Sequence, residues 1–383
     1  MATETAGQTP TTTEPIHSRN GATVRIDHLD KRFDTVAAVQ DVSFDIEAGE
    51  FITMLGPSGS GKTTTLMMIA GFEIPTSGEI YIDSSPVATI PPFRRNIGMV
   101  FQNYALFPHM TVAENIAFPL KMRKVDKATI ERRVGEVLEA VRLPGYGRRY
   151  PRQLSGGQQQ RIALARAIVF NPRVLLMDEP LGALDKKLRE WLQLEIKRIH
   201  RELGTTFVYV THDQEEALVL SDRIAVFNQG RIEQVGTGRE LYDEPATLFV
   251  GKFIGESTTL RGDAETSGTE TSLTVAGQKV VANDKLSGGR RPVILLRPEK
   301  LTLTAGSRPR ADNQNSLAGN VSEAIYLGSG SKYQVTLRDG SVAIVRAPLE
   351  AEQFAIGDEV DLRWHVSDSM LLADDERADL TLT

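Results

Sequence analysis

The chain has 383 residues, a length that suggests two or three domains at about 100–200 residues each. Its hydrophobic share of 40% and charged share of 25% are ordinary for a globular protein, and its formal net charge of −6 argues against a nucleic-acid-binding protein, because phosphate backbones attract basic surfaces. The chain has no cysteine, which excludes disulfides and thiolate metal sites, and no apolar run reaches the ~18 residues that a membrane-spanning helix needs.

A folded pattern begins near Ala22. Residues 1–20 are rich in Thr, contain Pro and acidic residues and lack the apolar segment of a signal peptide, so we expect a disordered tail. Further along, short apolar or alternating runs predict strands at Val24–Leu29, Val42–Ile46, Phe51–Leu55, Val174–Met177 and Phe207–Val210. Longer periodic runs predict helices at Thr63–Gly71, Ile130–Val141 and Gln158–Phe170. Helices that alternate with buried strands favour a largely parallel sheet.

The character of the sequence changes after about Ser257. From there the pattern predicts strands at Val293–Leu296, Lys332–Arg338, Val342–Val345 and Val360–Trp364. Asp339-Gly340 is typical of a hairpin turn between two of them. Residues 258–383 are therefore predicted to be all-β, as in a small barrel.

The strongest chemical signal is a glycine-rich loop after the strand Phe51–Leu55. It fits the P-loop pattern G-x-x-x-x-G-K-[ST] with Gly56, Pro57, Ser58, Gly59, Ser60, Gly61, Lys62 and Thr63. Its glycines let backbone N–H groups surround phosphate oxygens, Lys62 would contact the β- and γ-phosphates, and Thr63 would reach Mg²⁺. A merely flexible turn is the weaker alternative because a strand precedes the loop and a helix follows it. The loop also lacks the G-x-G-x-x-G order of a dinucleotide site.

Two carboxylates, Asp178 and Glu179, follow the strand Val174–Met177. The carboxyl end of a parallel strand borders the ligand crevice, so Asp178 could hold Mg²⁺ and Glu179 could deprotonate an attacking water. Solvated loop acids are the alternative, which the phosphate loop disfavours.

The segment Leu154-Ser155-Gly156-Gly157-Gln158 opens the predicted helix Gln158–Phe170. A serine and two glycines at a helix start make an N-cap and a second anion-binding site. From these residues alone, a structural helix cap is the simpler explanation.

These three motifs, in this order, resemble the nucleotide-binding subunits of ABC transporters over about residues 24–256. The resemblance implies an α/β P-loop NTPase domain at residues 21–257, with a helical subdomain at about 103–170. It also implies that residues 258–383 form an OB-like accessory domain of the TOBE type. ATP and Mg²⁺ would be its cofactors.

The resemblance implies roles for further residues. Glu179 would be the catalytic base, His212 would contact the γ-phosphate, and Gln102 would contact both Mg²⁺ and the attacking water. Phe33 would stack on adenine, a contact worth ~1–3 kcal/mol. Without the resemblance, Phe33 would be assigned to the core and His212 to a structural role. Additional nucleotide contacts are implied for Val39, Thr64, Asp185, Ser155, Gly156, Gly157 and Gln158.

The resemblance also implies partners. The family holds each ATP between the phosphate loop of one subunit and the LSGGQ segment of another, and because this chain carries one cassette, we expect the other subunit to be a second copy. The sequence by itself does not require that dimer. The resemblance further implies two transmembrane permease subunits and an extracellular or periplasmic solute-binding protein that acts indirectly. It also implies a peripheral position on the cytoplasmic face of the bacterial plasma membrane. Tyr104–Met110 is either subdomain core or part of a groove for a helix of a permease.

The C-terminal region, with Leu296–Glu299, is similar to the OB-like accessory domain of certain bacterial importer ATPases. The chain is most similar overall to the spermidine/putrescine import ATPase family, which Phe101–Thr111, Thr211–Leu218 and Phe253–Glu256 support. Importers of sugars, ferric iron or other small solutes share much of this pattern and stay as alternatives. A soluble ABC ATPase acting on nucleic acid would be expected to have a basic surface, a coiled-coil insertion or tandem cassettes. A regulatory nucleotide binder would lack Glu179.

The accessory domain could bind a ligand or brace the dimer, and we favour bracing.

Overall fold

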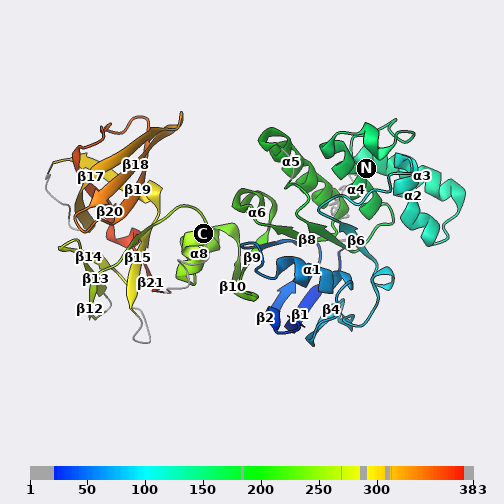
Figure 1. Ribbon diagram of the computed structural model, residues 1–383, viewed down its shortest axis with the longest axis horizontal. Helices are drawn as coiled ribbons and strands as arrows, with labels where there is room; N and C mark the ends of the chain where they lie inside the picture. Colours follow the sequence, from blue (N-terminus) through cyan, green and yellow to red (C-terminus); the bar gives the residue numbers. More distant parts are fainter. Residues whose placement is uncertain are drawn as a thin grey trace, which may run out of the picture.

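A computed structural model describes residues 21–182, 185–268, 270–284, 291–306, 311 and 313–374. The predicted tail, residues 1–20, lies outside the described residues, as do Ala183 and Leu184. An α/β part and an all-β part lie at opposite ends of the long axis (Figure 1). Helix α8 ends at Phe253 and strand β11 begins at Thr258, on the two sides of the boundary that the sequence predicted at residue 257.

A six-stranded sheet in the order β10-β9-β3-β8-β7-β6 is the centre of the α/β part. Strands β3, β6, β7, β8 and β9 pair in parallel, and β10 is antiparallel to β9. The bounds are β3 Phe51–Leu55, β6 Ile97–Val100, β7 Val174–Asp178, β8 Thr206–Thr211, β9 Arg223–Asn228 and β10 Arg231–Gly236. The predicted parallel sheet is confirmed.

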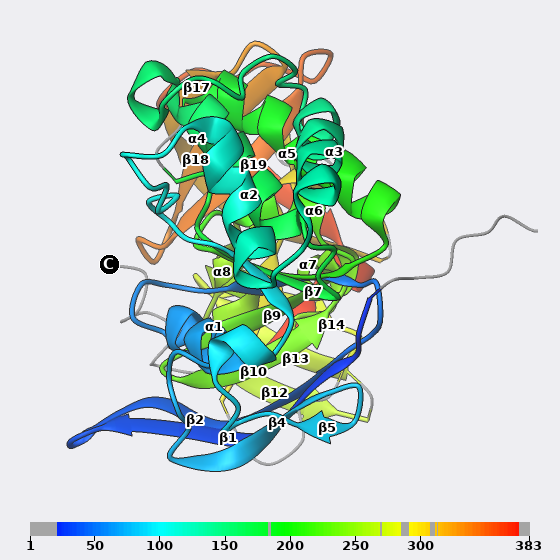
Figure 2. The same ribbon diagram turned by 90° about the vertical axis from the view of Figure 1, so that its right-hand side faces the viewer.

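Both faces of this sheet are buried, which explains why its strands are apolar throughout. In β7, Leu175 and Met177 pack into one core cluster, whereas Val174 and Leu176 pack into a second cluster on the opposite face. The first cluster lies under the helices α2 to α5, and the second under α1 and an antiparallel sheet. Figure 2 shows the helices α2 to α5 and the antiparallel sheet at opposite ends of this part, with α1 beside the antiparallel sheet.

The antiparallel sheet has the order β2-β1-β4-β5. Its strands are β1 Val24–Phe33, β2 Val36–Ile46, β4 Ser77–Ile82 and the short β5 Ser85–Pro86. Strands β1 and β2 are longer than predicted. The outer end of β1 is mainly polar, the outer end of β2 begins with the apolar run Val36–Val39, and the register between them is irregular there, so neither end shows a regular alternation.

The helices are α1 Lys62–Ala70, α2 Val112–Met122, α3 Lys127–Ala140, α4 Gly156–Ile168, α5 Lys186–Leu203, α6 Gln214–Leu220, α7 Gly238–Asp243 and α8 Leu248–Phe253. The three predicted helices correspond to α1, α3 and α4, each shifted by one to three residues. The predicted α4 starts two residues late, since Ser155 rather than Gly157 is its N-cap. Helix α2 contains Pro119, and begins at a capping box formed by Thr111 and Glu114.

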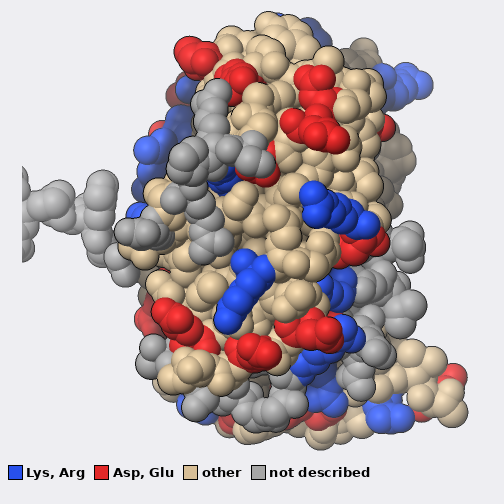
Figure 3. Space-filling view, turned by 90° about the vertical axis from the view of Figure 1, so that its left-hand side faces the viewer, with Lys and Arg blue, Asp and Glu red and all other residues tan. Residues whose placement is uncertain are grey.

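The C-terminal part is all-β, as predicted. Its described strands form three sheets, β11-β15-β21, β12-β13-β14 and β16-β20-β17-β18-β19, which surround one shared apolar core. The bounds are β11 Thr258–Leu260, β12 Asp263–Ser267, β13 Glu270–Val275, β14 Gln278–Ala282, β15 Pro292–Leu296, β16 Thr302–Ala305, β17 Gln314–Tyr326, β18 Gly330–Leu337, β19 Val342–Pro348, β20 Glu359–His365 and β21 Met370–Ala373. On the end face of this part, described acidic and basic side chains are interspersed among uncharged ones (Figure 3).

The two parts are joined by an apolar cluster and by the hydrogen bonds of a buried arginine, which together are called the joint. Val293, Leu295 and Leu372 of the β part pack into one cluster with residues of α6, α7, α8 and β9. Arg297, which is 1% exposed, donates to the carbonyl oxygens of Tyr242, Gly251 and Ile254 at 2.6–2.8 Å. The buried guanidinium thus fixes the end of α8 against the loop after β15.

Candidate functional site

The phosphate loop connects β3 to α1, as the sequence predicted. A side chain could not be added at Gly56, because its Cβ would lie 2.2 Å from the carbonyl oxygen of Phe227, and Gly61 has a φ of +100°. The loop is therefore a tight cradle beside the sheet edge, with Ser58 and Gly59 exposed and Gly61 at the helix start. Such a cradle fits the phosphates of a nucleotide.

Lys62 is buried within this cradle. Its ammonium donates to the carbonyl oxygens of Gly56 and Pro57, at 2.8 Å each, and lies 3.4 Å from the Ser60 hydroxyl. Burial lowers the pKa of Lys62, and the neighbouring Glu179 and Asp178 carboxylates oppose that shift. The nearby carboxylates therefore help to keep a buried positive charge at the loop.

Asp178 is the last residue of β7, and its carboxylate accepts a hydrogen bond from the Thr63 hydroxyl at 3.1 Å. Burial raises the pKa of Asp178, and the bond from Thr63 works against this rise. A hydroxyl and a carboxylate side by side are hard oxygen donors, which fit Mg²⁺. No group of three or more His, Cys, Asp or Glu residues that could hold a metal exists among the described residues.

Glu179 lies between two polar side chains from neighbouring strand ends. Its Oε2 accepts from the Gln102 amide at 3.3 Å, and its Oε1 is 3.2 Å from Nδ1 of His212. Gln102 follows β6, Glu179 follows β7 and His212 follows β8, three adjacent strands whose carboxyl ends share one sheet edge. Glu179 has a positive φ of 40°, and its N–H donates to Val210 of β8 at 3.0 Å, which fixes the turn that carries it.

The segment Ser155–Gln158 forms the N-terminus of α4. The Ser155 hydroxyl accepts from the Gln158 N–H, and the Gln158 side chain accepts from the Ser155 N–H, a complete capping box. Ser155 and Gly156 are exposed, while Gly157 is buried against Leu188 of α5. The structure therefore shows the helix cap and leaves Ser155 and Gly156, at the helix N-terminus, on the surface of the chain.

Asp185 caps α5 in the same way. Its carboxylate accepts from the Leu188 N–H at 3.0 Å. The cap lies just after the two residues outside the description, at the exposed start of the helix.

Residues of Tyr104–Met110 lie in both predicted environments, the subdomain core and an apolar groove. Tyr104 is buried in the subdomain core, whereas Ala105 and Phe107 line an apolar groove of about 320 Å³. Arg166 of α4 donates to the carbonyl oxygens of Tyr104 and Ala105 at 2.9 and 2.7 Å, which fixes the loop beside the groove.

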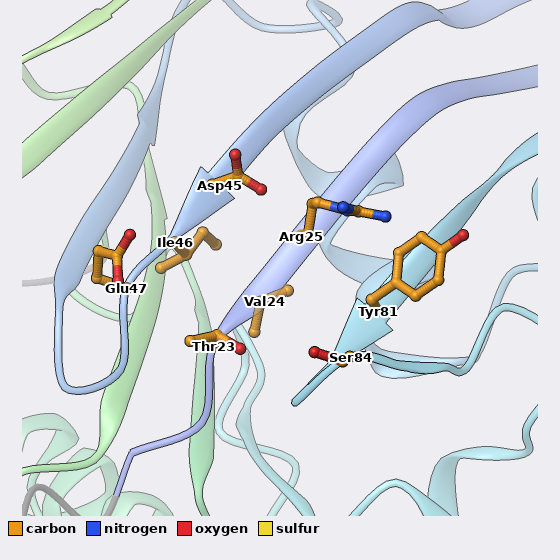
Figure 4. Close-up of a pocket in the computed structure, with 8 residues that line it drawn as sticks. All are labelled: Thr23, Val24, Arg25, Asp45, Ile46, Glu47, Tyr81 and Ser84. Atoms are coloured by element: carbon orange, nitrogen blue, oxygen red, sulfur yellow. The ribbon is translucent and has the colours of Figure 1, made fainter.

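A second cavity, of about 280 Å³, lies at the far end of the antiparallel sheet (Figure 4). There the Arg25 guanidinium lies 4.4 Å from the ring centroid of Tyr81, with Asp45 and Glu47 nearby. It contains none of the residues predicted to bind ATP.

Comparison with known proteins supplies the family. Residues 39–182 match the family model "ABC transporter" and residues 294–372 match "TOBE domain". A "Spermidine/putrescine import ATP-binding protein PotA" from Rubrobacter xylanophilus is 47% identical over 359 residues, which cover 91% of this chain and 93% of the relative. The protein of the same name from Thermobifida fusca is 51% identical, with 86% of each chain covered. The chain belongs to the ABC transporter ATP-binding proteins.

Solved structures support the same assignment for the α/β part of this ABC protein. The dimeric cassette MJ0796, in a post-hydrolysis state bound to ADP and phosphate, is 35% identical and has a TM-score of 0.51. The alignment covers 56% of this chain and 98% of MJ0796. CbiO1 from Clostridium perfringens, part of a cbiONQ transporter complex, is 28% identical with a TM-score of 0.54, over 58% of this chain and 90% of that one.

Two residues of this ABC protein that were expected to contact the nucleotide lie in different environments. Phe33, at the end of β1, is 45% exposed, and the Lys31 ammonium lies 4.8 Å from its ring centroid. A core role for Phe33 is therefore wrong. Val39 is fully buried, and its side chain lies 3.4 Å from where a Cβ of Gly61 would be. Val39 thus packs next to Gly61 at the end of the phosphate loop.

Replacing Phe33 with alanine tests the predicted contact with adenine in this ABC protein. We expect the KM for ATP to rise about fivefold or more, with a smaller loss in kcat, because a base–aromatic contact of ~1–3 kcal/mol is removed from ground and transition states alike. Steady-state phosphate release measures both constants. Phe93→Ala, at a phenylalanine that is 77% exposed, is the matched control and should leave the KM unchanged. An equally unchanged KM for Phe33→Ala would refute the stacking role.

Proposed function

We propose that this chain is the ATP-hydrolysing subunit of an importer for polyamines of the spermidine and putrescine class. The single observation that carries the hydrolytic assignment is the position of Glu179 between Gln102 and His212, beside the Asp178–Thr63 pair. The names of the full-length relatives support the substrate class. We also propose that residues 21–257 act as the nucleotide-binding domain and residues 258–383 as its accessory domain.

In this proposal the phosphate loop and Lys62 bind the β- and γ-phosphates of ATP, and Thr64 adds a contact at the start of α1. Thr63, Asp178 and Gln102 would hold Mg²⁺, which supplies charge neutralisation at the phosphates. Glu179 accepts a proton from the attacking water, whose orientation Gln102 helps to fix. His212 holds Glu179 on its other side and contacts the γ-phosphate. Catalysis consists of positioning and electrostatic stabilisation.

A second copy would complete each site. The exposed cap at Ser155 and Gly156 leaves backbone N–H groups at a helix N-terminus available to the γ-phosphate of ATP bound to the other copy. Asp185, at the exposed start of α5, would contact that copy. The dimeric cassettes among the similar structures support this arrangement.

The membrane partners would be two permease subunits, with a solute-binding protein acting on them from outside. Among the described residues, no helix is both long and apolar enough to cross a membrane. We propose that the chain lies peripherally on the cytoplasmic face of the plasma membrane and receives a short helix of one permease subunit in the groove lined by Phe107, Phe118 and Phe170.

The substrate class is tested by reconstitution with the permease subunits and the solute-binding protein in liposomes. We expect ATP hydrolysis to rise several-fold when the solute-binding protein is loaded with spermidine or putrescine, because closure of the two cassettes is coupled to docking of the loaded receptor. Phosphate release and uptake of radiolabelled polyamine measure the two halves of the coupling. An assembly with the Glu179→Gln chain is the inactive control.

Stimulation only by receptors loaded with a sugar or ferric iron would assign the chain to one of those importers instead. Hydrolysis stimulated by RNA or ribosomes would indicate the soluble alternative. That alternative has little support from the end face in Figure 3, where the described basic side chains are interspersed with acidic ones.

A further inference from the structure

Helices α5 and α6 contact each other (Figure 1). An ion-pair network joins them and includes Asp213, the residue that follows His212. Arg189, on the second turn of α5, has its Nη1 3.0 Å from the Asp213 carboxylate and its Nε 3.6 Å from the Glu216 carboxylate. Glu216 is 2% exposed, and Arg189 and Asp213 are partly buried. Nothing in the sequence pattern pointed to this network.

The network holds the backbone on both sides of His212. Before it, the hydroxyls of Thr211 and Tyr209 donate to Glu216 at 2.8 Å each. After it, the Asp213 N–H donates to the Thr211 hydroxyl at 3.0 Å, and the Asp213 carboxylate caps α6 by accepting from two N–H groups. Because hydrogen bonds hold residues 211 and 213, the backbone at His212 is fixed, and with it the direction in which the His212 side chain points.

Arg189 also connects this anchor to the start of α5. Its backbone N–H donates to the carbonyl oxygen of Asp185, the N-cap, at 2.9 Å, which is an ordinary i→i−4 bond of the first helical turn, so the side chain is carried by the start of α5. Burial raises the pKa of Glu216; the hydrogen bonds from Tyr209 and Thr211 oppose that rise, and the charge of Arg189 adds a smaller opposing effect. A displacement of the α5 start would therefore move the group that holds Asp213 and Glu216.

We propose that Arg189 is a positioning residue for ATP hydrolysis, which orients His212 through Asp213 and Glu216 and links its position to the start of α5. This inference rests on the proposed function, because it assumes that His212 acts in hydrolysis. Arg189 contacts no reacting atom. Its effect reaches the site through the backbone of residues 211–213.

The test is a double-mutant cycle on the full-length chain. Arg189→Gln should lower kcat about 10- to 100-fold, the scale expected from a small misplacement of a catalytic group, and leave the KM for ATP within about twofold. Arg189→Lys should recover part of the loss because it keeps the charge. In a His212→Ala background, Arg189→Gln should add almost no further loss, since residues that act as a unit are non-additive.

Arg198→Gln is the matched control. Arg198 lies on the same helix and also bridges two carboxylates, Glu195 and Glu202, so its loss reports a purely structural cost of weakening α5. Asp213→Asn removes the ion pair from the other side and keeps an N-cap, because asparagine caps helices as well as aspartate does. It should reproduce the kcat loss of Arg189→Gln, and it decides the question if Arg189→Gln fails to fold.

Two results would overturn the positioning role and leave the proposed function standing. In the first, the kcat losses of Arg189→Gln and His212→Ala multiply in the double mutant. In the second, Arg189→Gln lowers kcat no more than Arg198→Gln does. An unchanged kcat for His212→Ala would overturn both the inference and the role assigned to His212.

Discussion

Glu179→Gln should lower ATP turnover about 10²- to 10⁴-fold and leave ATP binding intact, because the amide keeps the size of the side chain but cannot accept the proton of the attacking water. The hydrogen bond from Gln102 and the approach of His212 place this carboxylate at the end of β7, next to Asp178. Phosphate release under single-turnover conditions measures the chemical step, and a fluorescent ATP analogue measures binding.

The control is Glu190→Gln, the same chemical change at an exposed position of α5. It should leave both quantities unchanged. Near-normal phosphate release by Glu179→Gln would mean that another group activates the water, and the assignment of the base would be wrong.

Arg297→Met should destabilise the C-terminal part by roughly 3 kcal/mol or more. The arginine is 1% exposed and donates to carbonyl oxygens of Tyr242, Gly251 and Ile254, and each buried acceptor left without a donor costs about 1–3 kcal/mol. Methionine keeps much of the apolar stem, so the loss reports mainly the missing donors.

Urea denaturation followed by the fluorescence of Trp364 measures this effect. Trp364 is buried in the C-terminal core, and a Trp191→Phe background removes the other tryptophan of the chain. Arg338→Met, at an exposed arginine of the same part, is the control. An unchanged midpoint for Arg297→Met relative to this control would show that the carbonyl bonds contribute little to the joint.

The parts of the site that the sequence could predict are short and contiguous. Gly56–Thr63 must be glycine-rich wherever such a loop forms, and the carboxylates Asp178 and Glu179 follow a strand whose apolar run reveals it, so local pattern sufficed for both. The parallel sheet followed from the same runs.

Contacts between segments distant in sequence could not be predicted in this way. Arg189 and Asp213 are 24 positions apart, and no periodicity indicates that α5 and α6 would bring them together. Arg297 lay in a recognised segment, Leu296–Glu299, but its carbonyl acceptors depend on how α8 ends. The bounds of β1 were missed because its outer half is exposed and irregular, and the burial of Val39 depends on the packing of β2 beneath the phosphate loop.

The most direct test of the central claim, that two copies of this chain form the ATP-hydrolysing site, is the molar mass of the Glu179→Gln chain measured by light scattering with and without Mg-ATP. We expect a monomer without nucleotide and a dimer with Mg-ATP, and Ser155→Arg should prevent that dimer by filling the exposed α4 N-terminus. A chain that binds Mg-ATP tightly and keeps the mass of a monomer at all concentrations would contradict it.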